Sequence, residues 1–409
     1  MIAELRHEFN RRYTDTAYRN LLADMDRITR TQISIRVAET PVFLPSSMLR
    51  QMIDAGAEMT HQLLNDSAYL RQAAATIPKA FRVAGPGAHP HFMTVDFGLV
   101  HTGEGAWQGD LATLEPRLVE LQAFPSVFGL QSVLGNLYSK HFELPSSLAH
   151  YPGGIDETTY WQKLRDVIVG DHAPENVILL EVTPEQQKTL PDFHVHGDHL
   201  GIRTVDITAV RQRGRKLFYD RDGVETPVHR IYNRAIVDEM VRKSVHPGFD
   251  LTGDLDVEWA GHPDWYFLIS KFALPHLRHP FVPPAVFLSD WMDGRGRDRI
   301  SEDRSQWVFK PLFSFAGKGI EFAPSDEALH SIPTAERGNY LLQQRVAFAP
   351  TVATPFGMTQ VEVRLMYVWP DGGELQAIQT LTRLGRGAMM GVDHNRNQQW
   401  VGGSAGLIL

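Results

Sequence analysis

The 409-residue sequence contains no cysteine. This absence excludes disulfide bonds, thiolate metal sites and a cysteine nucleophile, and it fits a reducing compartment. Long apolar runs are also missing, because no stretch reaches the roughly 18 apolar residues that a membrane-spanning helix needs. The first residues carry charge and no apolar core follows them, unlike a secretory signal peptide. We therefore expect a cytoplasmic protein.

An excess of positive charge is missing as well. Lys and Arg number 40 against 48 Asp and Glu, which gives a formal net charge of −8. The chain thus lacks the electrostatic footprint of a general nucleic-acid binder, although a local basic cleft for a nucleotide is compatible with this sum. We expect neither a nucleic acid nor a membrane as a partner. Hydrophobic residues at 43% and charged residues at 22% are typical of a globular chain, and the length predicts two or three domains.

Hydrophobic periodicity predicts an α/β fold. Apolar residues at three-to-four spacing indicate helices near the N-terminus, whereas the runs Phe92–Phe97 and Leu118–Leu121 are typical of two neighbouring strands. Farther along, strand and helix patterns alternate as in a small parallel sheet. We accordingly divide the chain into a helical region (1–84), a pair of strands (85–150), a small parallel α/β domain (151–250) and a C-terminal region of strands and Gly-rich segments (251–409).

The most informative string runs from Trp307 to Ile320. An apolar strand ends in Lys310, and a loop with Gly317, Lys318 and Gly319 follows. Glycines allow a backbone to approach a polyphosphate closely, and lysines supply point charges for it. The alternative is a plain hairpin with a glycine turn. The string by itself leaves both interpretations open.

The strand pair carries three oxygen-bearing side chains. Glu120 and Gln122 are two residues apart on one strand, so both point to the same face, where Asp96 of the neighbouring strand can meet them. Magnesium prefers oxygen ligands and is commonly completed by substrate phosphates. The three residues are therefore a candidate magnesium site. They could instead be solvent-facing residues of a half-polar sheet.

Several strings together resemble the glutathionylspermidine synthase family. The resemblance is carried by Ser270–Pro275 with His279-Pro280, by Val308–Pro311 with its glycine loop, by Tyr340–Gln344, and by the strand pair. It spans roughly residues 92 to 403 and leaves the first ninety uncovered. It implies a circularly permuted ATP-grasp fold, here an ATP-grasp-like module joined to the small α/β domain and the helical N-terminal part.

The resemblance also implies roles for individual residues. Lys271 and Lys310 would hold the phosphates of ATP, while Gln343 and Gln344 would lie at the hinge beside adenine. Asp96, Glu120 and Gln122 would hold Mg²⁺. Arg383 would neutralise the phosphoryl group in transfer, although it could be an ordinary surface arginine.

Two positions depart from the family pattern. Gln122 stands where the family has asparagine, and Thr94 stands where it has arginine, two residues before the metal-binding aspartate. If that arginine stabilises the acyl phosphate, Arg82 or Arg383 must replace it here. In the competing arrangement, the metal ligands follow the phosphate-binding lysines in the chain. They would then be Glu362, Asp393 and Asn395. We prefer the upstream set, because residues 393–397 have little strand character.

The function that follows is an ATP-dependent ligase. It would join a small-molecule carboxylate to an amine through an acyl phosphate, with ATP and Mg²⁺ as cofactors. A non-catalytic nucleotide-binding relative is one alternative. The other is a zinc hydrolase, because His194, His196, Asp198 and His199 fit the HxHxDH pattern of the metallo-β-lactamase fold. We interpret that string instead as a solvated helix start.

Overall fold

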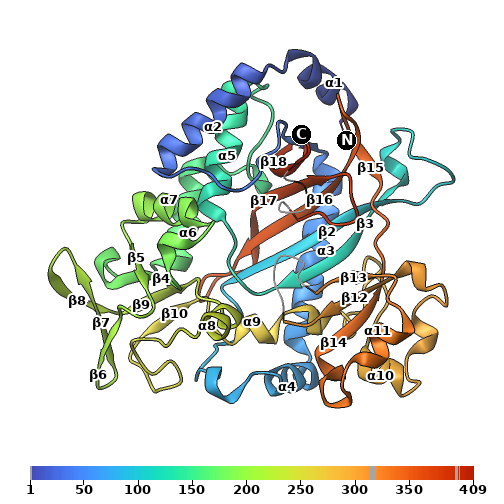
Figure 1. Cartoon of the computed structure of the whole chain (residues 1–409). Helices are drawn as coiled ribbons and strands as arrows, with labels where there is room; N and C mark the ends of the chain where they lie inside the picture. The colour runs from blue at the N-terminus through green and yellow to red at the C-terminus, as the bar shows by residue number, and fades with distance from the viewer. Residues whose placement is uncertain (1, 314–318, 392–394, 396) are drawn as a thin grey trace.

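A computed structural model describes residues 2–313, 319–391, 395 and 397–409. Its centre is a sheet of seven strands in the order β1 (Val42–Leu44), β18 (Gly402–Ile408), β17 (Gln376–Gly385), β16 (Gly357–Val368), β2 (Phe92–His101) and β3 (Leu114–Gln122), with β15 (Pro350–Thr354) paired to β16. All neighbours are antiparallel except β1 and β18. Strands from both ends of the chain thus lie side by side (Figure 1).

The two faces of this sheet differ because side chains alternate along each strand. On β16, Val361, Val363 and Leu365 are fully buried in the main hydrophobic core. Helix α3 (Ser46–Asn65) packs on that face. It comes so close that a Cβ on Gly56 would lie 2.3 Å from the hydroxyl of Tyr367, so only glycine fits there. The intervening residues of β16 therefore point to the opposite face.

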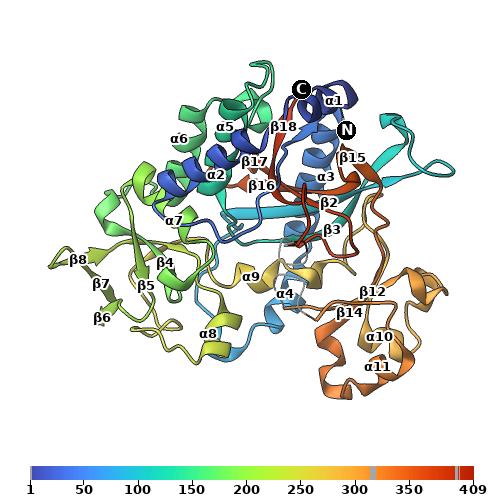
Figure 2. The same ribbon diagram turned by 45° about the horizontal axis from the view of Figure 1, so that its top comes forward.

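Helices cover part of that opposite face. α5 (Phe128–His141) packs on β17 and β18, and α2 (Asp15–Thr29) packs beside α5 (Figures 1 and 2). α1 (Ala3–Arg12) completes the helical layer, while α4 (Ser67–Ala75) follows α3. The first region is thus largely helical, as predicted. Strand β1 was not predicted, because three residues are too few to show a period and its pairing with β18 is set by tertiary contacts.

The predicted small parallel sheet is confirmed. Its order is β10 (Glu258–Ala260), β9 (Arg230–Asn233), β4 (Val177–Glu181) and β5 (Arg203–Asp206), and all its pairs are parallel. α6 (Glu157–Ile168), α7 (Leu190–Leu200) and α8 (Val237–Lys243) accompany it, and β6 (Arg211–Arg213), β7 (Lys216–Arg221) and β8 (Val224–Val228) form a separate antiparallel sheet. Strand β10 belongs to the parallel sheet although it follows residue 250, where we had placed the boundary.

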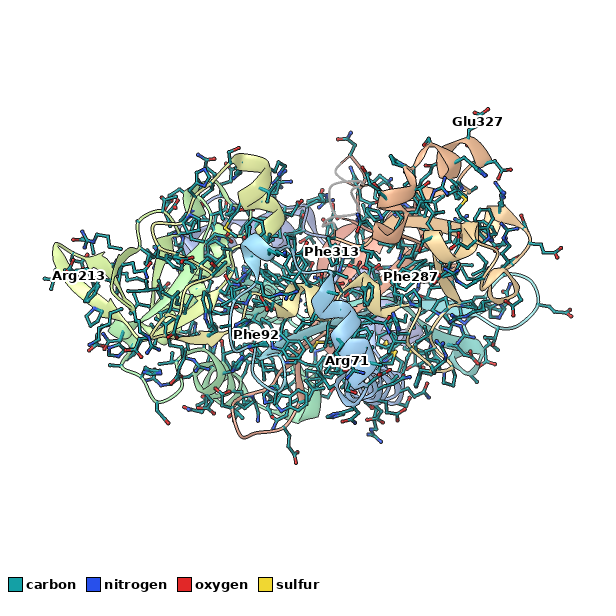
Figure 3. The ribbon with its side chains drawn as sticks, turned by 90° about the horizontal axis from the view of Figure 1, so that it is seen from below. Arg71, Phe92, Arg213, Phe287, Phe313 and Glu327 are labelled. Carbon is teal, nitrogen blue, oxygen red and sulfur yellow. The ribbon has the colours of Figure 1, made fainter. Side chains whose placement is uncertain are left out.

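A four-stranded antiparallel sheet forms the remaining unit. Its order is β11 (Ala285–Phe287), β14 (Tyr340–Gln344), β12 (Trp307–Pro311) and β13 (Glu321–Phe322), and α9 (Trp265–Leu268), α10 (Leu288–Met292) and α11 (Asp326–Ser331) lie in the same part of the chain. Seen from below, Arg213 of the β6–β8 sheet and Glu327 of α11 lie at opposite ends of the molecule (Figure 3). None of the helices in the described part of the chain has the length and apolar character needed to span a bilayer.

Candidate functional site

A cavity of about 460 Å³ lies where the large sheet meets the four-stranded sheet. It brings together residues from β2, β3, β16 and β17 with residues from β12 and β14. Seven of the residues predicted from the sequence line it: Asp96, Glu120, Gln122, Lys310, Gln343, Gln344 and Arg383. These residues are spread over nearly 290 positions of the chain, so the fold, and not local sequence, assembles the cavity.

The charged residues of the cavity occupy matching positions on adjacent strands. Asp96 on β2 is paired in register with Glu120 on β3 and with Arg364 on β16. Glu362, two residues before Arg364, is paired with Arg383 on β17. Paired residues in a sheet point to the same side. Four neighbouring strands therefore present their charges on one face.

Asp96 is bound by two arginines. Its Oδ1 accepts a hydrogen bond of 2.6 Å from Nε of Arg364, and its Oδ2 accepts bonds of 2.7 Å from Nη2 of Arg364 and of Arg383. Burial opposes the charged form of Arg364, but attraction to Asp96 raises the pKa of this guanidinium above its ordinary value. Both carboxylate oxygens of Asp96 are thus occupied by cations.

The two predicted lysines meet at Glu120. Lys271 Nζ lies 3.3 Å from Oε2 of Glu120, and Lys310 Nζ donates a hydrogen bond of 3.2 Å to the backbone oxygen of Val119. Burial disfavours the charge of Glu120, yet Lys271 and Lys310, with help from the two arginines, lower its pKa to about 2. Burial lowers the pKa of Lys310 to about 8. Glu120 is therefore ionised, while Lys310 titrates close to neutrality.

Local irregularities position these side chains. The β2–β3 register shifts between Asp96 and Phe97, which leaves Val119 as an extra residue on β3. Such a bulge frees its carbonyl from the ladder, and Lys310 uses it. Lys271 lies in a short 3₁₀ turn, Lys271–Ala273, whose N-cap Ser270 accepts a hydrogen bond of 3.2 Å from the amide of Phe272.

The predicted glutamines line the cavity, whereas the described part of the glycine loop does not. Nε2 of Gln343 is buried and has no hydrogen-bond partner among the described residues, whereas Oε1 of Gln344 accepts a hydrogen bond of 3.3 Å from the amide of Ser301. Gly319 has the positive φ of 72° that glycine favours, and it is not among the lining residues. Gly317 and Lys318 lie outside the described residues.

One member of this charge network carries no motif that marks it in the sequence. Arg364 was not predicted as a site residue, although the alternation of charge and apolar residue from Val361 to Leu365 signals a second polar face on that strand. Arg364 stands directly opposite Asp96. It can therefore take the place of the family's arginine, for which this chain has Thr94. Arg82, our other candidate, binds the backbone oxygen of Ala74 and does not line the cavity.

The competing metal set does not assemble in the described residues. Glu362 lines the cavity beside Arg383, with 3.1 Å between Glu362 Oε1 and Arg383 Nε. Asn395 instead donates hydrogen bonds to the backbone oxygens of Met389 and Gly391, and it is not among the lining residues. Asp393 lies outside the described residues. Burial, opposed by Arg383 and reinforced by Asp96, raises the pKa of Glu362 to about 7.

The histidine string belongs to α7, and the zinc alternative is wrong for the described part of the chain. His196 is buried and bonded to the backbone oxygen of Asp192, while His194 bonds to that of Thr29. Asp198 pairs with Arg30, and His199 stacks on Trp161 at 3.8 Å between ring centroids. The helix spreads the four side chains around its axis. Nowhere in the described residues do three His, Cys, Asp or Glu side chains form a group that could hold a metal. Our description of a solvated helix start is also wrong, because His196 is in the interior.

Oxygen and cation chemistry of the cavity fits a nucleotide phosphate better than a bare metal ion. Lys310, Arg364 and Arg383 line the cavity with three carboxylates. Lys271 is not among the lining residues but pairs with Glu120, so the cations outnumber the carboxylates around the cavity. Glu120 and Gln122 supply oxygens on one strand face. That number is sufficient for a magnesium ion completed by phosphates, though too small for a site built from protein ligands alone.

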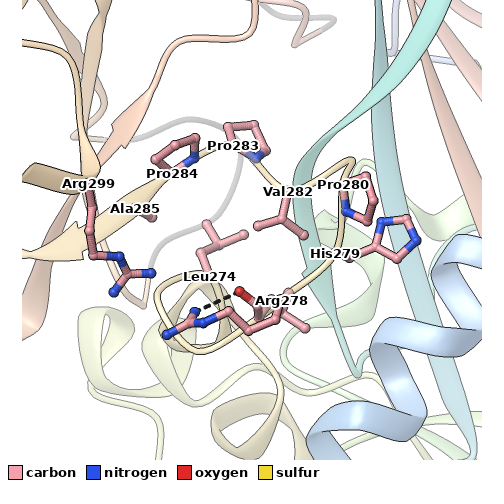
Figure 4. Close-up of a pocket in the computed structure, with 10 residues that line it drawn as sticks. Leu274, Arg278, His279, Pro280, Val282, Pro283, Pro284, Ala285 and Arg299 are labelled. Carbon is pink, nitrogen blue, oxygen red and sulfur yellow. Dashed lines mark hydrogen bonds between the residues drawn. The ribbon is translucent and has the colours of Figure 1, made fainter.

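A second cavity, of about 480 Å³, lies along residues 274–285 (Figure 4). Arg278 and Arg299 stand at its edge, and Arg278 donates hydrogen bonds to the backbone oxygens of Pro275 and Leu277. Both arginines are exposed, and none of the predicted site residues lines this cavity, although Leu274, His279 and Pro280 of the family-like strings do. It is therefore separate from the charged site.

Comparison with known proteins concerns the fold. No family model matches the chain, and no curated protein matches it. Among solved structures, the chain has the α/β fold of glutathione synthetase-like proteins of the ATP-grasp type. One such structure is a glutathione synthetase-like effector from Globodera pallida in its apo form, with a TM-score of 0.55 and 12% identity, covering 98% of this chain and 99% of that chain. It confirms the predicted ATP-grasp-like fold and extends it over the first ninety residues.

Proposed function

We propose that this protein is an ATP-dependent carboxylate–amine ligase. The observation that carries the proposal is the group of cations around three carboxylates in an ATP-grasp-like fold: Lys310, Arg364 and Arg383 line the cavity, and Lys271 pairs with Glu120 of its wall. Phosphoryl transfer needs mainly charge neutralisation and positioning, and the described residues of this cavity provide both. The substrates would be small molecules, because the net charge of −8 does not favour a nucleic acid as a partner.

Each group has a distinct part in this proposal. Lys271 and Lys310 hold the phosphates of ATP, and Glu120 with Gln122 holds Mg²⁺ against them. ATP supplies the γ-phosphoryl group that converts a carboxylate to an acyl phosphate with release of ADP. The amine then attacks the acyl carbon, the C–N bond forms, inorganic phosphate leaves and the nitrogen loses a proton. Arg383 neutralises the negative charge that moves between these species.

The unpartnered amide of Gln343 also supports a ligand. A buried donor without a hydrogen bond is costly, and native structures seldom tolerate one. Nε2 of Gln343 is in that condition on β14, in the wall of the cavity. We propose that an acceptor atom of the bound nucleotide satisfies it.

Nucleotide binding is tested by calorimetry with MgATP. Lys310→Ala should weaken binding at least about tenfold, because it removes a buried charge on the phosphates. Lys216→Ala is the matched control, since Lys216 is exposed on β7, in a different sheet. Equal affinities of the wild type and Lys310→Ala would overturn the assignment of this lysine to phosphate.

Magnesium binding is tested by turnover. Glu120→Gln keeps the shape of the side chain but removes its charge, so Mg²⁺-dependent ATP hydrolysis should be abolished. The variant should still fold, as circular dichroism checks, although loss of the anion beside Lys271 and Lys310 lowers its thermal unfolding temperature, so turnover is measured well below that temperature. Retention of Mg²⁺-dependent hydrolysis would show that Glu120 is not a metal ligand.

The pairing of Asp96 supports a second candidate function. Both oxygens of Asp96, the expected metal ligand, already accept hydrogen bonds from arginines, three bonds in all, which leaves this carboxylate little capacity to bind Mg²⁺ as well. A non-catalytic nucleotide-binding protein is consistent with this arrangement. MgATP binding without release of ADP, with panels of carboxylates and amines present, would favour this second function.

A further inference from the structure

The cavity has an apolar part that the proposed nucleotide chemistry does not use. Its wall continues from the charged sheet face along α2, the segment after it, and α5. The side chains there are Met25, Ile35, Val37, Val127, Leu130 and Leu134. They belong to the same hydrophobic core cluster, and α2 and α5 lie side by side in both views of the ribbon (Figures 1 and 2).

Phosphates and metal ions have no affinity for such a wall. Met25, Val37, Leu130 and Leu134 are at most 4% exposed, whereas Ile35 and Val127 are only half-buried where they line the cavity, so these two keep apolar surface that is not fully covered. An apolar group of a ligand would cover it. The apolar wall therefore suits a molecule, or a part of one, other than a triphosphate.

Ser126 joins the charged and apolar parts. Its backbone oxygen accepts a hydrogen bond of 3.0 Å from Nη1 of Arg234, and its hydroxyl accepts one of 3.4 Å from Nη1 of Arg364. Arg234 is only 5% exposed and lines the cavity; its Nη1 also donates a hydrogen bond of 2.7 Å to Oδ2 of Asp192, while its Nε has no hydrogen-bond partner among the described residues and is the group left to bind an acid. Two buried guanidinium groups thus flank the position where α5 begins.

We propose that the carboxylate substrate is amphipathic, with its acid group beside Ser126 between Arg364 and Arg234 and an apolar chain along α2 and α5. This inference rests on the proposed ligase function, because that function requires a carboxylate in the cavity. The arginines fix the acid group next to Glu120 and Lys310, where phosphoryl transfer would occur. The wall of α2 and α5 selects acids that carry an apolar chain over short, polar ones.

A homologous series of acids tests the apolar wall directly. Binding of acetate, butanoate, hexanoate, octanoate and decanoate is measured by calorimetry with the full chain and no nucleotide. Each added methylene should strengthen binding about threefold to fourfold until the wall is covered. Decanol, which lacks the acid group, should bind at least about tenfold more weakly than decanoate. Affinity that is independent of chain length, or equal binding of decanol and decanoate, would overturn the proposal.

A matched pair of variants locates the chain of the acid. Ile35 lines the cavity, whereas Ile33, in the same segment and equally half-buried, does not. Ile35→Asn should reduce decanoate affinity about tenfold and leave acetate affinity unchanged, while Ile33→Asn should change neither. Thermal unfolding measurements check that both variants fold. If Ile35→Asn does not fold, Ile35→Ala replaces it, with a smaller expected loss of decanoate affinity. Unchanged decanoate binding by the Ile35 variant would overturn the placement.

The outcome is separable from that of the ligase proposal. Affinity that rises with the chain length of the acid, in a protein that does not bind MgATP, would support the amphipathic acid site and refute the ligase. MgATP-dependent turnover, together with an acid affinity that is independent of chain length, would support the ligase and refute the amphipathic substrate.

Discussion

Asp96 and Arg364 face each other across the β2–β16 ladder, and two hydrogen bonds of 2.6 and 2.7 Å join the carboxylate to the guanidinium. Both side chains are largely removed from water, and 268 residues separate them in sequence. The pair holds the central strands of the large sheet in one register. It also fixes the charge at the middle of the candidate site.

Removal of Arg364 should destabilise the protein strongly. Arg364→Met leaves Asp96 buried with only Arg383 as a cationic partner, and we expect a loss of about 3 kcal/mol in the free energy of unfolding. Urea denaturation measures it. Arg203→Met is the control, because Arg203 and Asp222 form an exposed pair, and its cost should be below about 1 kcal/mol. Similar costs for the two variants would contradict a structural role of the buried pair.

Glu362 should make the protein less stable as the pH rises. Burial raises its pKa from 4.5 to about 7, so between these values the folded state holds a proton that the unfolded state has released. The free energy of unfolding then falls with increasing pH in that window, by at most about 3 kcal/mol. Glu362→Gln should remove this part of the pH dependence. Parallel stability curves for the wild type and Glu362→Gln would show that Glu362 is ionised throughout.

Lys310 should make nucleotide binding pH-dependent. Burial lowers its pKa to about 8, so its positive charge is lost as the pH rises above that value. MgATP affinity should therefore decline above pH 8, by at most about tenfold per pH unit, because only the charged form attracts phosphate. Calorimetry from pH 7 to 9.5 follows this decline. Lys310→Arg, whose guanidinium stays charged, should keep its affinity constant over the same range, and a parallel decline in that variant would assign the titration to another group.

The histidines of α7 should matter for stability and not for metal content. His196 is fully buried, so His196→Ala leaves a cavity and should cost about 2 kcal/mol in the free energy of unfolding. His194→Ala, at a half-buried position, should cost less. Elemental analysis of both variants and the wild type should find no stoichiometric zinc. Zinc that is present in the wild type and lost in both variants would revive the hydrolase interpretation.

Local patterns in the sequence were sufficient for the parts of the site that depend on one strand at a time. Side chains alternate along a strand, so Glu120 and Gln122 had to share a face, and both do line the cavity. The apolar run before Lys310 likewise predicted a strand that ends at the site. The parallel sheet followed from strand and helix alternation, whereas β1 was too short to show any period.

Tertiary structure alone decided which charges meet. Strand order places β16 between β17 and β2, so Arg364 of β16 binds Asp96 of β2. It also brings Glu362 into the cavity that the sequence assigned to Asp96, Glu120 and Gln122 alone. The tertiary structure also put α2 and α5 beside the charged face, and no motif in either segment indicated this position. The reason is physical: the period of a strand or helix fixes the direction of each side chain within that element. Its partners are fixed by burial and hydrogen bonding between segments hundreds of residues apart.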